Sequence, residues 1–304
     1  MGFNPVSLQL LEKNCEYVCR WYNATMQHSS LTSFPTDVIH GNGQHIFELV
    51  AYLSGKRPPG QASKAALAAT SLNAKDYIKV LVQQYEDLIN FLKVNGAHLN
   101  TVRPEYLLSL SDQNKFLKMN PKEENMKPKT LERVWPYLAM ESWLTVFYQV
   151  LKIYYLNRVT PKSFKNLPGM PPTETSIEPN MTKSNVYSVP ETILLKWMTY
   201  HYCRVNPMHP KVVTNFSADL RDGLVFAALI RSHYGEAQAL QDLKASAPYE
   251  DQALLSAKRV IEAVHEIGLQ THLTPDDIVQ PSARELLLFC VQLYQGLPHY
   301  IAKA

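Results

Sequence analysis

The stretch Asn215–Gly235 reads NFSADLRDGLVFAALIRSHYG, and it decides how the C-terminal half of the chain folds. Its first five residues are typical of a tight turn, and Ser217 is placed to cap the helix that follows. After Asp222-Gly223, apolar residues recur at helical spacing and also flank that face. This pattern predicts a turn that leads into a central helix buried nearly all round.

Two carboxylates lie close together in this stretch, Asp219 and Asp222. Paired carboxylates can carry acid–base chemistry when a second reactive group stands beside them. No histidine or nucleophile is adjacent to them in the sequence, so capping and turn formation is the preferred interpretation.

Further helical patterns surround the central helix, and strand signals are scarce, which predicts an all-α protein. A helix starting at Pro190 has one apolar face, formed by Leu194, Trp197, Met198 and His201. Two more amphipathic stretches, 253–268 and 283–297, follow it. The residues that we assign to the core are Trp197, Leu220, Phe226 and Leu293.

Segments of this half resemble the calponin-homology family in the right order. They are LLKWMTYH (194–201), VTNFSADLRDGLVFAALI (213–230), IGLQTHLTPDDIV (267–279) and LLLFCVQLY (286–294). The resemblance implies an all-helical calponin-homology domain over residues 190–300. It also implies a binding module without catalytic activity, because the family binds actin, microtubules or signalling partners.

The first half resembles a second, divergent copy over residues 1–160. Gly43 and Gly55 are twelve residues apart, as are Gly223 and Gly235, and Trp21 is a plausible counterpart of Trp197. This spacing indicates an internal repeat, so we expect tandem calponin-homology domains. The copy departs from the pattern because Asn42-Gly43 replaces the Asp-Gly turn and no Asp-Leu pair precedes it. A phosphate-binding loop is the alternative for HGNGQH (40–45), but no Lys-Ser/Thr pair follows it.

Two irregular stretches interrupt the helical patterns. Residues 111–136 are rich in Lys, Asn and Pro, and we interpret them as a long loop inserted into the first domain. Residues 161–189 contain several prolines, which predicts a linker of polyproline character between the two domains.

Composition narrows the function classes. The net charge is +3 and the pI is about 8.5, too weakly basic for a nucleic-acid partner. The four cysteines lack zinc-type spacing, so we expect buried reduced thiols, no metal and no cofactor. No signal peptide is visible, and the apolar run 144–156 is too short to span a membrane. We expect neither a membrane partner nor any catalytic residues.

A divergent first domain, a proline-rich linker and a well-formed second domain together resemble the giant calponin-homology proteins of cilia and flagella, which act in the axonemal central apparatus. The segment MESWLTVFYQVLKIYYLNRVTP (140–161) carries part of this similarity. It implies a cytoskeletal scaffold of the axoneme, with microtubules or axonemal proteins as partners. The alternative is an actin-binding tandem module, with filamentous actin as the partner.

Exposed basic positions are the candidates for a filament contact, because both actin and tubulin present acidic surfaces. In the second domain they are Lys196, Arg204, Lys211, Lys258 and Arg259, and Tyr200 is a further candidate contact residue beside them. In the first domain they lie between Lys115 and Arg133. The competing interpretation is ordinary solvated surface charge.

Overall fold

The computed structural model describes residues 5–26, 30–60, 74–120, 128–177, 186–243, 246–247 and 249–298. Over these ranges the regular structure is entirely helical, and the all-α prediction is confirmed. The chain divides into two compact units, Met1–Tyr154 and Tyr155–Ala304, which we call unit 1 and unit 2.

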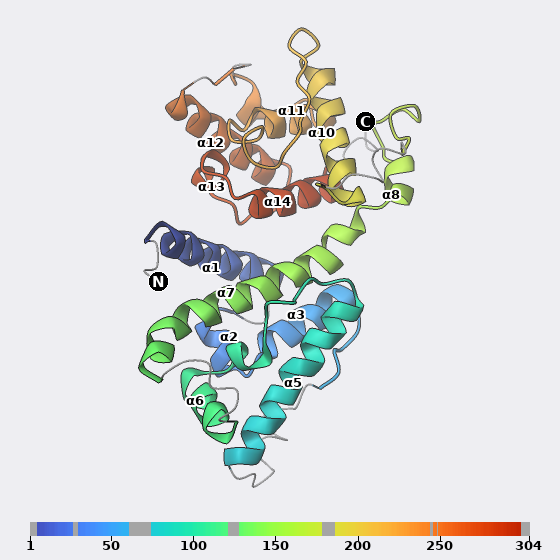
Figure 1. Cartoon of the computed structure of the whole chain (residues 1–304). Coiled ribbons are helices and arrows are strands. Elements are labelled where there is room, and N and C mark those ends of the chain that lie inside the picture. Colours follow the sequence, from blue (N-terminus) through green and yellow to red (C-terminus); the bar gives the residue numbers. More distant parts are fainter. Residues whose placement is uncertain are drawn as a thin grey trace. The chain divides into compact units, whose positions relative to one another are not determined.

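Unit 1 is a bundle arranged around one long helix. Its elements are α1 (Pro5–Thr25), α2 (Thr36–His40), α3 (Gln44–Ser54), α5 (Ala74–Val94), η1 (Pro104–Leu107), α6 (Leu110–Met119) and α7 (Pro128–Tyr154). Helix α7 packs against α1, α3, α5, α6 and η1, so it is the axis of the unit (Figure 1). Aromatic side chains fill the space around it: Trp21 meets Phe147 edge-on at 5.8 Å between ring centroids, and Tyr85 meets Trp143 at 5.5 Å.

Unit 2 is a second bundle, with the predicted central helix at its heart. Its elements are η3 (Leu156–Arg158), α8 (Pro161–Lys165), α10 (Val189–Val205), α11 (Leu224–His233), η4 (Gln238–Leu240), α12 (Glu250–Glu266), α13 (Pro275–Val279) and α14 (Ala283–Gly296). Helix α11 packs between α10 and α12, and α14 also packs on α10. The four expected core residues, Trp197, Leu220, Phe226 and Leu293, are all fully buried.

The internal repeat is visible in the backbone. Gly43 directly precedes α3 and Gly223 directly precedes α11, and both adopt the left-handed conformation, with φ of 75° and 72°. A Cβ on Gly43 would lie 2.8 Å from the Tyr85 ring, and one on Gly223 would lie 3.2 Å from the Ala257 backbone nitrogen. Both turns therefore require glycine for its conformation and for its lack of a side chain.

A polar turn before each glycine is also repeated. Asp219 accepts hydrogen bonds from the backbone N–H and hydroxyl of Thr214, both at 2.8 Å. Asp37 accepts the same pair from Thr32, at 2.7 and 2.8 Å. The first half thus keeps the carboxylate of the turn, although it lacks the Asp-Leu pair. Its Asp is followed by the buried Val38 instead of leucine, and the shared Thr-x4-Asp spacing was the signal that could have found it.

The expected loop at 111–136 is wrong for the residues that the structure describes. Helix α6 covers 110–119 and α7 begins at Pro128, while 121–127 lie outside the described residues. Ser109 caps α6 by accepting the Asp112 N–H. Proline is tolerated in the first turn of a helix, so Pro128 opens α7 without breaking it. Lysine and glutamate are good helix formers, although their polarity suggested a loop.

The prediction of a polyproline linker is also wrong over residues 161–177. Pro161 stands at the first position of α8, behind a capping box of Thr160 and Ser163. Phe164 is fully buried, and Leu167 and Met170 are at most 9% exposed. This segment therefore folds as part of unit 2, and residues 178–185 lie outside the described residues.

The two ends of α3 allow a matched test of the glycine turn. Gly55 also has a positive φ, of 69°, but a Cβ there would meet no atom within 4 Å. We expect Gly55→Ala to cost about 1 kcal/mol from backbone strain alone. We expect Gly43→Ala to cost about 2–4 kcal/mol, because the clash with Tyr85 adds overpacking. Urea unfolding of the two variants checks this, and equal midpoints would contradict it.

Candidate functional site

Three of the predicted contact residues lie on one face of α10, which we call the α10 basic face: Lys196, Tyr200 and Arg204. Their spacing of four residues places them in a row along the helix. Lys196 Nζ donates a hydrogen bond to the Ser176 carbonyl at 3.2 Å, and Arg204 Nη1 donates to the Gly169 carbonyl at 3.3 Å. The row is therefore in contact with the chain's own segment after α8, which sequence reasoning missed.

The structure does not gather the remaining three candidates onto this face. Lys211 Nζ donates to the Asp219 carbonyl at 2.8 Å, so it braces the turn before α11. Lys258 and Arg259 are exposed on α12, and Arg259 pairs with Glu262 at 3.0 Å. The six residues thus divide among α10, the turn before α11, and α12.

Two of the basic candidates of unit 1 lie on helices, while residues 121–127 of the same stretch lie outside the described residues. Lys115 lies on α6 and pairs with Asp112 of the same helix at 2.9 Å. Arg133 lies in the second turn of α7 and is exposed. These residues are therefore fixed on helices instead of a mobile loop.

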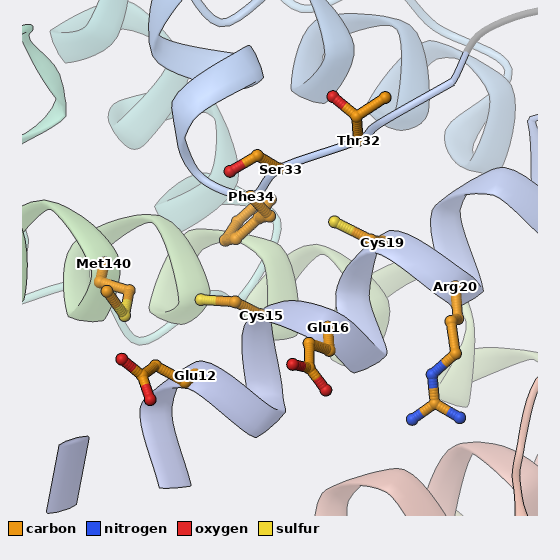
Figure 2. Close-up of a pocket in the computed structure, with 9 residues that line it drawn as sticks. All are labelled: Glu12, Cys15, Glu16, Cys19, Arg20, Thr32, Ser33, Phe34 and Met140. Atoms are coloured by element: carbon orange, nitrogen blue, oxygen red, sulfur yellow. The ribbon is translucent and has the colours of Figure 1, made fainter. Parts of the chain in front are cut away.

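Unit 1 also contains a hollow between α1, the segment before α2, and α7. Its volume is about 530 Å³, and its lining residues are Glu12, Cys15, Glu16, Cys19, Arg20, Thr32, Ser33, Phe34 and Met140. Figure 2 shows the side chains of Cys15, Phe34 and Met140 converging at one end, while Glu16 and Arg20 extend away from the thiols. The floor is therefore sulfur-rich and apolar, and the charges are at the rim.

The two thiols of this hollow are poorly suited to chemistry. Burial, with smaller contributions from the neighbouring Cys19 and the carboxylates of Glu12 and Glu16, raises the pKa of Cys15 to about 12. Burial also raises the pKa of Cys19. Both remain protonated at neutral pH, whereas nucleophilic attack and metal binding require the thiolate. Both are free cysteines, of which Cys15 is buried and Cys19 is half-buried.

Two histidines face one another in the core of unit 2. The rings of His201 and His233 lie 4.2 Å apart, and both pack against Trp197. His201 Nδ1 lies 2.7 Å from the Ser232 hydroxyl, and His233 Nδ1 lies 2.8 Å from the Leu229 carbonyl, to which it donates. Burial lowers the pKa of His201 to about 2 and that of His233 to about 4. The pair is therefore neutral at physiological pH and serves as core packing.

Among the described residues, no three His, Cys, Asp or Glu side chains are grouped to hold a metal ion. No described helix is long and apolar enough to cross a membrane.

Comparison with protein families assigns both halves of the chain. The family described as "Cilia- and flagella-associated protein 47 domain" matches residues 2–159, just over half of the 304 residues. The calponin-homology domain family matches residues 188–298. The calponin-homology resemblance of the second half is thereby confirmed.

Curated proteins of two kinds are similar to the chain. Human cilia- and flagella-associated protein 47 is 28% identical over 91% of this chain and 10% of its own length. Fimbrin-5 of Arabidopsis thaliana is 37% identical over 35% of this chain and 14% of its own length. The chain thus spans about a tenth of the length of the ciliary relatives that it matches.

A solved structure shows the same fold across both units. The actin-crosslinking core of Schizosaccharomyces pombe fimbrin covers 94% of this chain and 50% of its own, with a TM-score of 0.58 and 17% identity. The expected tandem calponin-homology fold is confirmed by this likeness.

The buried histidine pair predicts that the free energy of unfolding decreases as the pH is lowered. Unfolded histidine titrates near pH 6.5, and both folded pKa values are lower, so the unfolded chain binds more protons below that pH. As the pH falls from 6.5 to 5, the loss of stability per histidine should steepen toward about 1.4 kcal/mol per pH unit. Urea unfolding across this range measures the slope.

Single substitutions test whether this slope comes from the pair. We expect His233→Gln to reduce the slope by about half, since it removes one of two titrating groups. His209→Gln is the control, because His209 is exposed in the loop after α10. An unchanged slope in His233→Gln would show that other groups cause the acid sensitivity.

Proposed function

The chain belongs to the cilia- and flagella-associated protein 47 domain family, and from this premise we propose that it is a non-catalytic interaction module of a cilium or flagellum. It would act as a scaffold in the axonemal cytoskeleton, including the central apparatus, and bind microtubules or microtubule-associated proteins there. The single observation that carries the proposal is the match of that family to residues 2–159, the whole of unit 1 except its first residue.

The roles of the reactive side chains support a binding module over an enzyme. Asp37 and Asp219 are occupied as acceptors within their own turns. His201 and His233 are neutral core residues, and the Cys15 thiol is held protonated by burial. Groups with these structural roles are poorly placed to act on a substrate.

The exposed cations supply the contacts in this proposal. Lys258 and Arg259 project from α12 into solvent, so a partner can reach them without any rearrangement. Lys196, Tyr200 and Arg204 form a second contact row on α10, and Lys211 stands near the turn before α11. Attraction between such groups and an acidic filament increases the rate of encounter and weakens with salt.

Actin binding is the second candidate function. It is favoured by the fold shared with the actin-crosslinking core of a fimbrin, although that likeness concerns the fold alone. The relatives named for cilia and flagella cover far more of this chain than the fimbrins do, which favours the axonemal proposal.

Co-sedimentation with purified filaments tests the proposal. We expect saturable pelleting of the full chain with microtubules, weakening as salt is raised from about 50 to 200 mM, because the contact is electrostatic. Saturable pelleting with actin and none with microtubules would reject the axonemal proposal and favour the alternative.

Charge reversal on α12 tests the contact residues. We expect Lys258→Glu with Arg259→Glu to weaken microtubule binding about tenfold, since each lost pair contributes and like charges repel. The matched control is Lys79→Glu with Lys93→Glu on α5, which changes the net charge equally on exposed positions of unit 1. Equal weakening by both double variants would show that net charge, and not the α12 face, governs binding.

A further inference from the structure

We propose that the loop Lys165–Ser176 is an intramolecular cover that occupies Lys196 and Arg204 on the α10 basic face, and that an acidic protein surface competes with this loop for these two cations. The inference rests on the proposed function, because it describes how one contact face of the same module becomes available to a filament.

The loop is a closed structural unit. Thr175 is buried, and its hydroxyl lies 3.3 Å from the Lys165 carbonyl and 3.2 Å from the Pro172 carbonyl, where it can donate to either. The two ends of the loop are thereby held together. Compact surface loops with neighbouring ends are frequently functional elements.

Apolar side chains are buried more completely in the stretch before the loop than within the loop. Leu156, Val159 and Phe164 are at most 1% exposed, and α8 and η3 both pack on α10 (Figure 1). Within the loop, Leu167 and Met170 are 7% and 9% exposed. Lys196 and Arg204 also hold the loop through exposed hydrogen bonds to the Ser176 and Gly169 carbonyls, so the loop can separate from α10 while the buried stretch before it stays in place.

Chemistry favours an acidic competitor. In the covered state Lys196 and Arg204 donate to backbone carbonyls, which carry no net charge. A carboxylate forms shorter and stronger charge-assisted hydrogen bonds, and it can engage arginine with both oxygens. Tyr200 lies between the two cations, and tyrosine is a residue type enriched where proteins meet. An acidic surface can therefore replace the loop's carbonyls with better acceptors.

The experiment releases the loop in the full chain with Met170→Asp, which places a charge at a buried site. Hydrogen exchange should show at least tenfold faster exchange at the Met170 and Glu174 amides, which donate to the Leu167 and Pro171 carbonyls within the loop. Amides of α11 should be unchanged. Microtubule pelleting should show at least threefold tighter binding, and adding Lys196→Glu with Arg204→Glu should abolish the gain.

The control is Val186→Asp, an equal charge at a position that is 78% exposed in unit 2, and it should alter neither measurement. If Met170→Asp also accelerates exchange in α11, Thr175→Val replaces it, because this change removes the loop's closing bonds at constant shape. The same criteria then apply.

The outcomes separate this inference from the proposed function. Microtubule binding that is equal with the loop closed and released overturns the cover and leaves the proposed function standing. No microtubule or actin binding in either state rejects both. A gain seen with actin alone supports the cover and rejects the axonemal partner. Unprotected loop amides in the unaltered chain also overturn the cover.

Discussion

Each half of this molecule depends on a left-handed turn that only glycine can make, because neighbouring atoms leave no space for a side chain there. Gly43 and Gly223 turn the chain through the left-handed region directly before α3 and α11. Atoms of another helix occupy the space that a side chain would need at each glycine. In unit 1 they belong to the Tyr85 ring, and in unit 2 they belong to the Ala257 backbone. The packing of α11 on α12, and that of the Tyr85 ring of α5 against the turn before α3, follow from these two missing side chains.

The polar turns before these glycines explain how the two halves could diverge in sequence and keep one fold. A carboxylate that accepts from a threonine five residues earlier fixes the loop, and this arrangement is the same for Asp37 and Asp219. The residues around it are free to change, provided that they bury apolar atoms. Leu220 in unit 2 and Val38 in unit 1 follow the carboxylate, and both are fully buried.

Sequence patterns predicted the helical class, the central helix of unit 2 and its core, because apolar spacing and an Asp-Gly turn are local signals. They failed at Pro128 and Pro161, since the same residue that breaks a helix also opens one. They also failed where burial depends on distant residues. The row of Lys196, Tyr200 and Arg204 follows from helical spacing, but the segment that contacts it lies some 20–35 residues earlier in the chain, and no local pattern reports it.

In the second half of the chain, the family match and the compact folded unit begin at different residues. The shared calponin-homology sequence begins at residue 188, whereas unit 2 begins at Tyr155. Leu156, Val159 and Phe164 lie in this preceding stretch and are buried in the unit. A genetic exchange that moved only the shared sequence into another protein would leave their apolar partners facing water. The shared calponin-homology sequence therefore depends, for the burial of its own apolar surface, on a stretch of chain that lies before it.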